Sequence, residues 1–312
     1  MRLPLQGGLP PVGAVAGPVV EIACDESGFS GSNLLHKATP VITHASVDLT
    51  VDEAVELIVA LRSRFRFSPN EFKSAQFLRS PQAGEALGWL LAALERRAHV
   101  HLIDKEYFLV TRIVDLFLAE PSYAAGTRLT EGNRPAALIL YRAGRSASSD
   151  WRVFLAAFVD LVRAKRRHRP DRRALEHFFQ ARDALLRDGL GAPAEAVLHA
   201  LHPTRILAVL ARLGHDDRSI PPPLEPMLPA LAETVLFWSG GQRPVLVIHD
   251  EQSALTAGRL RRLQEVLADG VPLSPLAGLV MVDSRDDPRV QVADLLAGVA
   301  RRLPRTVKHL TA

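Results

Sequence analysis

Four short apolar segments of this chain each end in an aspartate: Asp25, Asp104, Asp250 and Asp283. Short apolar runs that stop at polar or turn-forming residues predict β-strands. The carboxyl ends of parallel strands lie along one edge of a sheet, so aspartates that are far apart in the sequence would meet there. For any one of the four taken alone, a turn or a helix N-cap is the better interpretation. The four together constrain the fold more than any other feature.

The surrounding pattern predicts an α/β protein. In the last third of the chain, apolar strands at 243–252 and 276–284 alternate with helices at 253–268 and 288–303. Alternation of this kind implies parallel pairing and helices layered on a sheet. A β-branched strand at 40–49 is expected beside the first strand, and Thr50 is placed to cap the helix that follows.

The chain is expected to have three parts. Residues 1–17 are broken by Pro and Gly and predict a flexible tail. Residues 18–110 and 235–305 form a discontinuous core, because the strand signals fall there. Residues 111–234 are predominantly helical, contain a Pro-rich joint, and predict a large helical insertion.

Composition excludes several classes of protein. Of 312 residues, 47% are hydrophobic and 23% are charged, which is the profile of an ordinary soluble globular protein. No apolar run reaches the ~18 residues of a membrane span, and no membrane partner is expected. The single cysteine, Cys24, excludes an intramolecular disulfide, and together with the absence of a secretory signal it favours the cytoplasm. The sequence does not indicate an oligomeric state.

The charge distribution suits a polyanionic partner. The net charge is +4, and six Lys or Arg residues occur in the nine positions 165–173. Nucleic acid, either DNA or RNA, is the expected partner, and a solvated basic surface is the alternative.

Asp294 is the most telling acidic residue, because it lies within the apolar segment 290–300. A buried carboxylate is costly unless a cation or hydrogen-bond donors compensate its charge. Gln291 and Gly298 share its helical face, so that face could lie close over a sheet edge. The alternative is an exposed aspartate on an amphipathic helix.

Convergence of these carboxylates would favour a metal site. Oxygen-only ligands select hard cations such as Mg²⁺ or Mn²⁺, and two ions about 3.5–4 Å apart serve phosphodiester cleavage. Lys73, two residues after Glu71, could contact a phosphate or the transition-state charge, although a surface salt bridge is the ordinary interpretation.

Several motifs, taken in order, resemble the family known as domain of unknown function 3800. They are DESG at 25–28, EFK at 71–73, IDK at 103–105, IHDE at 248–251, and VDS followed by VQVADLLAG at 290–298. The match covers about 18–110 and 235–303, and the last helix is its most specific part.

The resemblance implies a ribonuclease-H-like mixed sheet flanked by helices, with metal ligands on the first, fourth and fifth strands and the last helix. Carried over, it suggests Asp25 on strand one, Asp104 or a neighbour on strand four, Asp250 on strand five and Asp294 on the helix. Glu26 and Glu71 are possible additions. A short third strand is poorly marked here, and residues 108–235 carry no motif of the family.

The resulting hypothesis is a metal-dependent nuclease or a related phosphoryl-transfer hydrolase that acts on nucleic acid. Its predicted catalytic residues are Asp25, Asp250, Asp294, Glu71 and Lys73, and its predicted metal ligands are Asp25, Glu26, Asp104, Asp250 and Asp294. Two alternatives stay open at this point. One is a phosphatase or ATPase that uses the same carboxylates, and the other is a non-catalytic domain that binds nucleic acid or protein.

Overall fold

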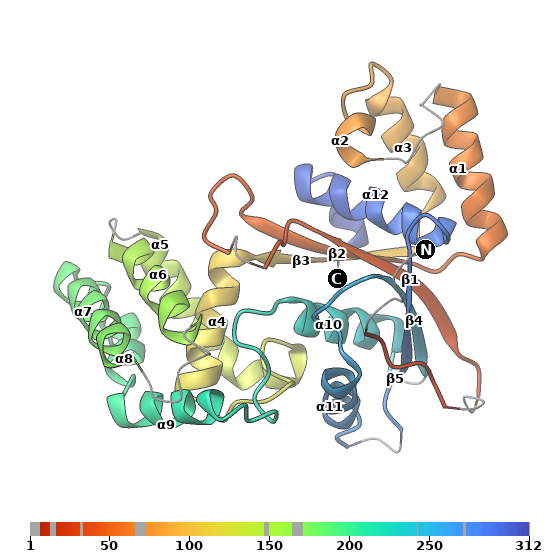
Figure 1. Ribbon diagram of the computed structural model, residues 1–312. Helices are drawn as coiled ribbons and strands as arrows, with labels where there is room; N and C mark the ends of the chain where they lie inside the picture. Colours follow the sequence, from red (N-terminus) through yellow and green to blue (C-terminus); the bar gives the residue numbers. More distant parts are fainter. Residues whose placement is uncertain are drawn as a thin grey trace. The chain divides into compact units, whose positions relative to one another are not determined.

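The computed structural model describes residues 7–12, 17–31, 34–65, 73–146, 150–163, 171–241, 243–270 and 273–311. The chain divides into two compact units, each of which is described by itself. The first comprises 1–29, 41–103 and 230–312 and holds the β-sheet, and the second comprises 30–40 and 104–229 and is helical (Figure 1).

The first unit is built on a mixed sheet of five strands in the order β3-β2-β1-β4-β5 among the described residues. The strands are β1 Val20–Ser27, β2 Val41–Val47, β3 Ala98–Asp104, β4 Val245–Asp250 and β5 Leu276–Val282. β1 pairs antiparallel with β2 and parallel with β4, and β4 pairs parallel with β5. The predicted α/β class, the neighbouring first two strands and the parallel pairing in the last third are confirmed.

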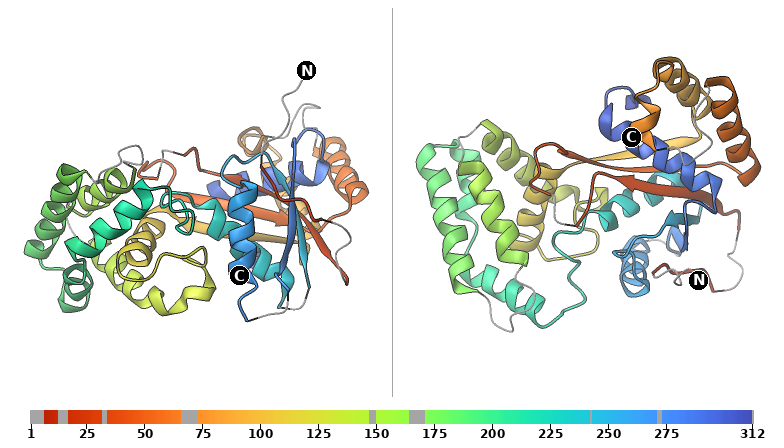
Figure 2. Two further views of the ribbon diagram at one scale, coloured as in Figure 1. Left: turned by 60° about the horizontal axis from the view of Figure 1, so that its bottom comes forward. Right: turned by 45° about the horizontal axis from the view of Figure 1, so that its top comes forward.

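Four helices cover one face of the sheet: α1 Val51–Phe65, α2 Ser74–Phe77, α3 Ala83–Ala93 and α12 Pro288–Arg302. α12 lies directly on β1 and β2, with α1 and α2 against it (Figures 1 and 2). Their apolar side chains form one buried cluster with alternate residues of the strands, including Ala23, Ala45 and Ile248. The apolar residues at helical spacing in the sequence are therefore the ones that these helices bury against the sheet.

Local capping fixes where two of these helices begin. At the start of α1, Thr50 Oγ1 accepts a hydrogen bond from Glu53 N, and the Glu53 carboxylate accepts one from Thr50 N. This reciprocal pair is a capping box and confirms the predicted N-cap. At the start of α12, the Asp287 carboxylate accepts from Arg289 N, and Pro288 occupies the first turn, where its missing N–H costs nothing.

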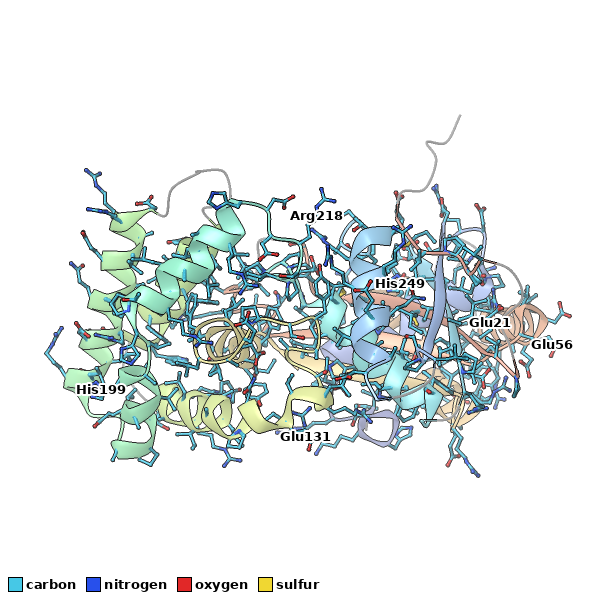
Figure 3. All side chains as sticks on the ribbon, turned by 90° about the horizontal axis from the view of Figure 1, so that it is seen from below. Glu21, Glu56, Glu131, His199, Arg218 and His249 are labelled. Atoms are coloured by element: carbon cyan, nitrogen blue, oxygen red, sulfur yellow. The ribbon has the colours of Figure 1, made fainter. Side chains whose placement is uncertain are left out.

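The other face of the sheet carries α10 Met227–Ser239 and α11 Ala257–Leu267. Trp238 of α10 donates from its indole N–H to Ser46 Oγ on β2, 2.8 Å away. Figure 3 shows His249 inside this unit, whereas Glu56 projects outward from α1.

The expectation of a flexible tail over 1–17 is wrong for two of its described residues. Leu9 forms an antiparallel bridge with Leu279 of β5, and Gly8 N donates to Leu255 O. Gly278 makes room for this contact, because a Cβ at that position would lie 2.8 Å from Leu9 O. The bridge gives the edge strand β5 backbone partners that an exposed edge would lack.

The second unit is a bundle of helices: α4 Lys105–Phe117, the 3₁₀ helix η1 Arg128–Asn133, α5 Arg134–Ser146, α6 Asp150–Arg163, α7 Arg172–Asp188, α8 Ala192–His199 and α9 Pro203–Gly214. Aromatic side chains form its centre, where Phe117 meets Phe158 and Phe178 edge-on. The expected boundary at residues 110 and 111 falls inside α4, and the segment 30–40 also belongs to this unit.

The strand numbering implied by the family resemblance is wrong. Asp104 ends β3 rather than a fourth strand, and Asp250 ends β4 rather than a fifth. The described sheet has no additional short strand before β3, and Asp283 is the residue that follows β5. None of the described helices combines the length and the apolar character that a membrane crossing requires.

Candidate functional site

Three of the predicted carboxylates meet on the α12 face of the sheet. Asp25 follows Ala23 by two positions on β1, and Asp250 follows Ile248 by two on β4. Side chains two apart on a strand share a face, and both Ala23 and Ile248 belong to the cluster beneath α12. α12 itself carries Asp294. The parallel pairing of β1 with β4 therefore delivers two acidic side chains to the helix that supplies the third.

Asp25 is the most buried of these residues, with 6% of its surface exposed. Its Oδ1 accepts a hydrogen bond from Glu26 N at 2.6 Å. Burial raises the pKa of the Asp25 carboxyl well above its ordinary value, and the negative charges of Glu26, Asp294 and Asp250 raise it further, in that order. The mutual repulsion expected for converging carboxylates is thus present at Asp25.

Glu26 points to the opposite side of β1 but still contributes to this electrostatic environment. Burial raises the pKa of the Glu26 carboxyl to about 7. Gln252 Nε2 donates to Glu26 Oε1 at 2.6 Å, and this hydrogen bond opposes the rise because it stabilises the carboxylate. Gln252 was not among the predicted residues. The sequence feature that could have identified Gln252 is its position two residues after Asp250, in the loop that follows β4.

Asp250 is held by the loop after β5. Its Oδ1 accepts a hydrogen bond from Ser284 N at 3.0 Å, which ties the end of β4 to the residues that follow β5. Asp283, the fourth strand-end aspartate, instead pairs with Arg285, whose Nη2 lies 2.6 Å from Asp283 Oδ2. The late Asp-Ser motif therefore positions Asp250 through the Ser284 backbone.

Asp294 has a cationic neighbour. Lys73 Nζ lies 3.7 Å from Asp294 Oδ2, and the two side chains are 56% and 25% exposed. Asp294 is partly buried, as expected, and Lys73 forms with it the salt bridge that is the ordinary interpretation of this lysine. Gly298 permits the approach of α2 to α12, because a Cβ there would lie 2.1 Å from Ser74 Oγ.

The rest of the DESG motif fixes the turn after β1. Arg301 Nε of α12 donates to Ser27 Oγ at 2.9 Å. Gly28 has a φ of +99°, and a Cβ there would lie 2.6 Å from Val41 O. Only glycine fits such a close turn with positive φ. The motif thus supplies two acidic groups, a tether to α12 and the glycine with positive φ that follows β1.

The remaining predicted acidic residues are Asp104 and Glu71. Asp104 belongs to the helical unit, where it caps α4 by accepting from Tyr107 N at 2.9 Å and also accepts from Tyr141 OH at 2.9 Å. Its role as a metal ligand stays a prediction. Glu71 lies outside the described residues, as do positions 165–170 of the basic segment.

The donor set fits a hard divalent cation in its chemistry, because it consists of carboxylate oxygens in a partly buried place. Within the described ranges, however, no three His, Cys, Asp or Glu side chains stand in an arrangement that could hold an ion. Asp25 and Asp250 each direct an oxygen at a backbone N–H group.

His249 is excluded from the acidic cluster by the alternation of the strand. It is fully buried on the opposite face, where it contacts His44 of β2. His249 is therefore a core residue. Cys24, also fully buried on β1, is likewise a core residue.

Comparison with protein-family models, with curated proteins and with solved structures finds no match to this chain.

Proposed function

We propose that the protein is a divalent-metal-dependent nuclease, or a related phosphoryl-transfer hydrolase acting on nucleic acid, with a ribonuclease-H-like first unit. The observation that carries the proposal is that Asp25 of β1, Asp250 of β4 and Asp294 of α12 face one another closely enough for the charges of the last two to raise the pKa of Asp25. More than 200 residues of sequence separate Asp25 from Asp250 and Asp294. The three carboxylates nevertheless lie on the same face of the sheet, beneath α12.

The strand order supports the same proposal. β1 is central and flanked by β2 and β4, and α12 crosses it as the last α-helix of the described chain. The family resemblance suggests Asp25, Asp250 and Asp294 as metal ligands from two strands and the last helix. They lie on β1, β4 and α12, although the resemblance expects Asp250 one strand later.

The proposed roles follow from the local chemistry. Asp25, Asp250 and Asp294 would hold Mg²⁺ or Mn²⁺, and Glu26, on the opposite side of β1, would add negative charge near them. A bound divalent ion would supply an activated water and neutralise charge on the leaving oxygen. Lys73 Nζ is 3.7 Å from Asp294 Oδ2 and its side chain is mostly exposed, so its ammonium would contact a phosphate of the substrate.

The test is cleavage of labelled single- and double-stranded DNA and RNA by the full chain, with Mn²⁺ or Mg²⁺ against EDTA. Asp25→Asn and Asp294→Asn are expected to lower the cleavage rate at least a hundredfold, because each removes charge from the site while keeping the side-chain shape. Asp52→Asn is the matched control, since Asp52 is exposed in the first turn of α1.

Cleavage that persists in both site variants would refute the assignment. Binding of nucleic acid without cleavage under any metal condition would favour the non-catalytic alternative. Release of inorganic phosphate from a nucleotide, with no cut in any strand, would favour the phosphatase or ATPase alternative.

A further inference from the structure

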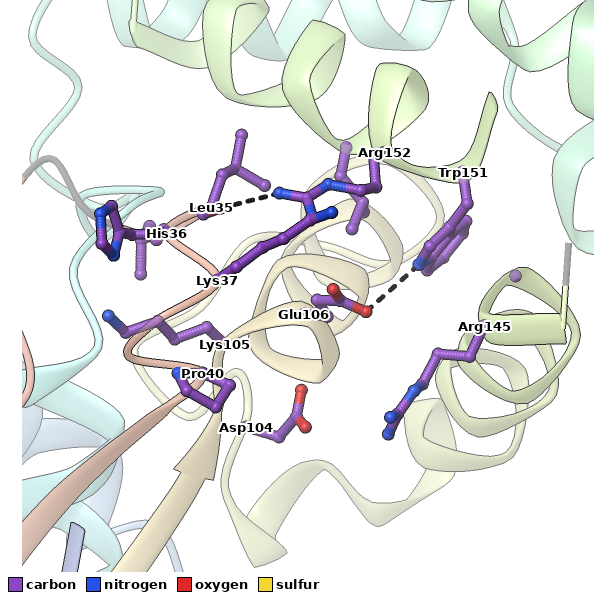
Figure 4. A pocket seen from close by; sticks show the side chains of 13 residues that line it. Leu35, His36, Lys37, Pro40, Asp104, Lys105, Glu106, Arg145, Trp151 and Arg152 are labelled. Carbon is purple, nitrogen blue, oxygen red and sulfur yellow. Dashed lines mark hydrogen bonds between the residues drawn. The ribbon is translucent and has the colours of Figure 1, made fainter. Parts of the chain in front are cut away.

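The helical unit contains a cavity of about 290 Å³ that no part of the proposed nuclease site uses. Its wall is formed by the segment before β2, the start of α4, the end of α5 and the start of α6 (Figure 4). The volume is at the lower end of ligand pockets, which span about 300–1,000 Å³, and suits a small group rather than a whole nucleotide.

Cationic groups dominate the lining. Lys37, Lys105, Arg145 and Arg152 line the cavity together with two carboxylates, Asp104 and Glu106. Four positive and two negative groups leave a formal charge of 4 − 2 = +2, with His36 counted as neutral. A phosphate monoester carries a charge of about −1.5 to −2 at neutral pH and would balance this excess.

Both carboxylates are engaged by neighbours within the unit. Asp104 accepts hydrogen bonds from Tyr107 N and Tyr141 OH. Glu106 accepts from the indole N–H of Trp151 at 3.4 Å (Figure 4). Each carboxylate therefore accepts its hydrogen bonds from uncharged donors of the helical unit.

The cations keep donors for a ligand. Arg152 uses Nη2 to donate to Leu35 O at 3.1 Å, and Arg145 uses Nη1 to donate to Tyr141 OH at 2.8 Å. A guanidinium has five N–H donors, so each retains further ones. Lys37 is exposed at the rim, whereas Lys105 is 1% exposed and its ammonium donates to Thr39 Oγ1 at 3.1 Å.

The wall is closely packed between α5 and α6. Gly144 permits the indole of Trp151 to lie against α5, because a Cβ at Gly144 would lie 2.3 Å from the ring. Trp151 is itself 3% exposed. The ends of α5 and α6 that carry Arg145 and Arg152 are therefore fixed to each other by close packing.

We propose that this cavity binds a phosphate monoester, such as the terminal phosphate of an oligonucleotide, through Lys37, Arg145 and Arg152. Arginine forks match the oxygens of a phosphate, and the rim lysine adds a point charge. A cavity of this small volume suits a terminal phosphate better than a phosphodiester, whose chain continues on both sides of the phosphate. The site goes beyond the proposed cleavage and does not depend on a metal ion.

The experiment is titration calorimetry of the full chain in EDTA, at constant ionic strength. The probes are inorganic phosphate, a thymidine dinucleotide with a 5′-phosphate, and the same dinucleotide with a 5′-hydroxyl. Lys37→Ala and Arg145→Ala are each expected to weaken phosphate binding about tenfold, because each removes a charge-assisted donor. Arg142→Ala is the control, since Arg142 is exposed on the same helix and does not line the cavity.

Saturable binding of phosphate and of the phosphorylated dinucleotide, with less than a twofold change in Arg142→Ala, is the expected result. Equal binding of the 5′-hydroxyl dinucleotide would overturn the proposal, as would the absence of saturable phosphate binding. Equal weakening in all three variants would also overturn it, because that pattern reports general charge.

The outcome is separable from that of the nuclease proposal. Asp25→Asn and Asp294→Asn should bind phosphate like the unmodified chain, since neither residue lines the cavity. Phosphate binding without cleavage would therefore refute the nuclease proposal alone, and cleavage without phosphate binding would refute the phosphate site alone.

Discussion

His44 Nε2 lies 3.2 Å from His249 Nε2 in the interior of the sheet unit, and both imidazoles are fully buried. His249 Nδ1 is 2.8 Å from Asp250 O, a carbonyl that can only accept, so Nδ1 carries the proton. In the neutral ring, Nε2 of His249 then accepts from His44 Nε2–H. His44 Nδ1 must in turn accept from the Thr234 hydroxyl at 2.8 Å.

Thr234→Val should therefore destabilise the protein by about 1–3 kcal/mol, the cost of leaving the buried His44 Nδ1 without a donor. Burial lowers the pKa of His44 well below its ordinary value, so protonation does not relieve that loss near neutral pH. Urea unfolding at pH 7.5 measures the effect. Thr234→Ser keeps the hydroxyl and is the matched control, and an equal loss in both variants would contradict the hydrogen-bond chain.

Glu26→Gln should stabilise the metal-free protein at alkaline pH. The pKa of Glu26 is 4.5 in the unfolded chain and about 7 in the fold, because burial disfavours the carboxylate. The folded state therefore binds the proton more tightly, and this contribution to stability is complete below pH 4.5 and is lost as the pH rises through about 7. Glutamine removes the charge, so the gain should approach roughly 3 kcal/mol at pH 8 and vanish near pH 4.

The measurement is urea unfolding in EDTA at a series of pH values, taken as the difference between variant and unmodified chain. Other titrating groups then cancel to first order. Glu56→Gln is the control, because Glu56 is exposed on α1. A gain at pH 8 that is the same at pH 4, or one shared by Glu56→Gln, would contradict the assignment of the effect to burial.

Sequence pattern predicted the α/β class and the apolar strands well, because the short apolar runs of β1, β4 and β5 and the helical spacing of α12 are local signals. The order of the strands in the sheet depends on pairing between distant segments, which no local pattern reports. The resemblance placed Asp104 and Asp250 one strand too late, since it allowed for a short strand that the described sheet lacks.

The candidate site was predicted only in part for a similar reason. Asp25, Asp250 and Asp294 carry a signal because each interrupts or ends an apolar run. Gln252 and Ser284 act through single hydrogen bonds formed across loops, and no periodicity marks such contacts. The bridge from Leu9 to Leu279 is also a tertiary contact, and the Gly- and Pro-rich sequence around Leu9 resembles that of an ordinary linker.

Lys73→Met should change stability by less than about 1 kcal/mol, because its ion pair with Asp294 is 3.7 Å long and Lys73 is 56% exposed. The small difference should disappear in 1 M NaCl, where exposed charges are screened. The cleavage rate should fall at least tenfold if Lys73 contacts the substrate. Lys308→Met is the control, because Lys308 is an exposed lysine of the same unit. A large loss of stability that persists in salt would assign Lys73 a structural role instead.

Gly298→Ala should destabilise the protein by about 1–3 kcal/mol, because its Cβ would lie 2.1 Å from Ser74 Oγ and 2.4 Å from Ser74 Cβ and would force α2 away from α12. Ser74→Gly removes both of these atoms. In a double-mutant cycle measured by urea unfolding, the loss caused by Gly298→Ala should be much smaller in the Ser74→Gly background. Additive losses would show that the crowding lies elsewhere. Since α2 begins next to Lys73, the same variant should also weaken the effect of Lys73 on cleavage, which links this packing contact to the acidic site.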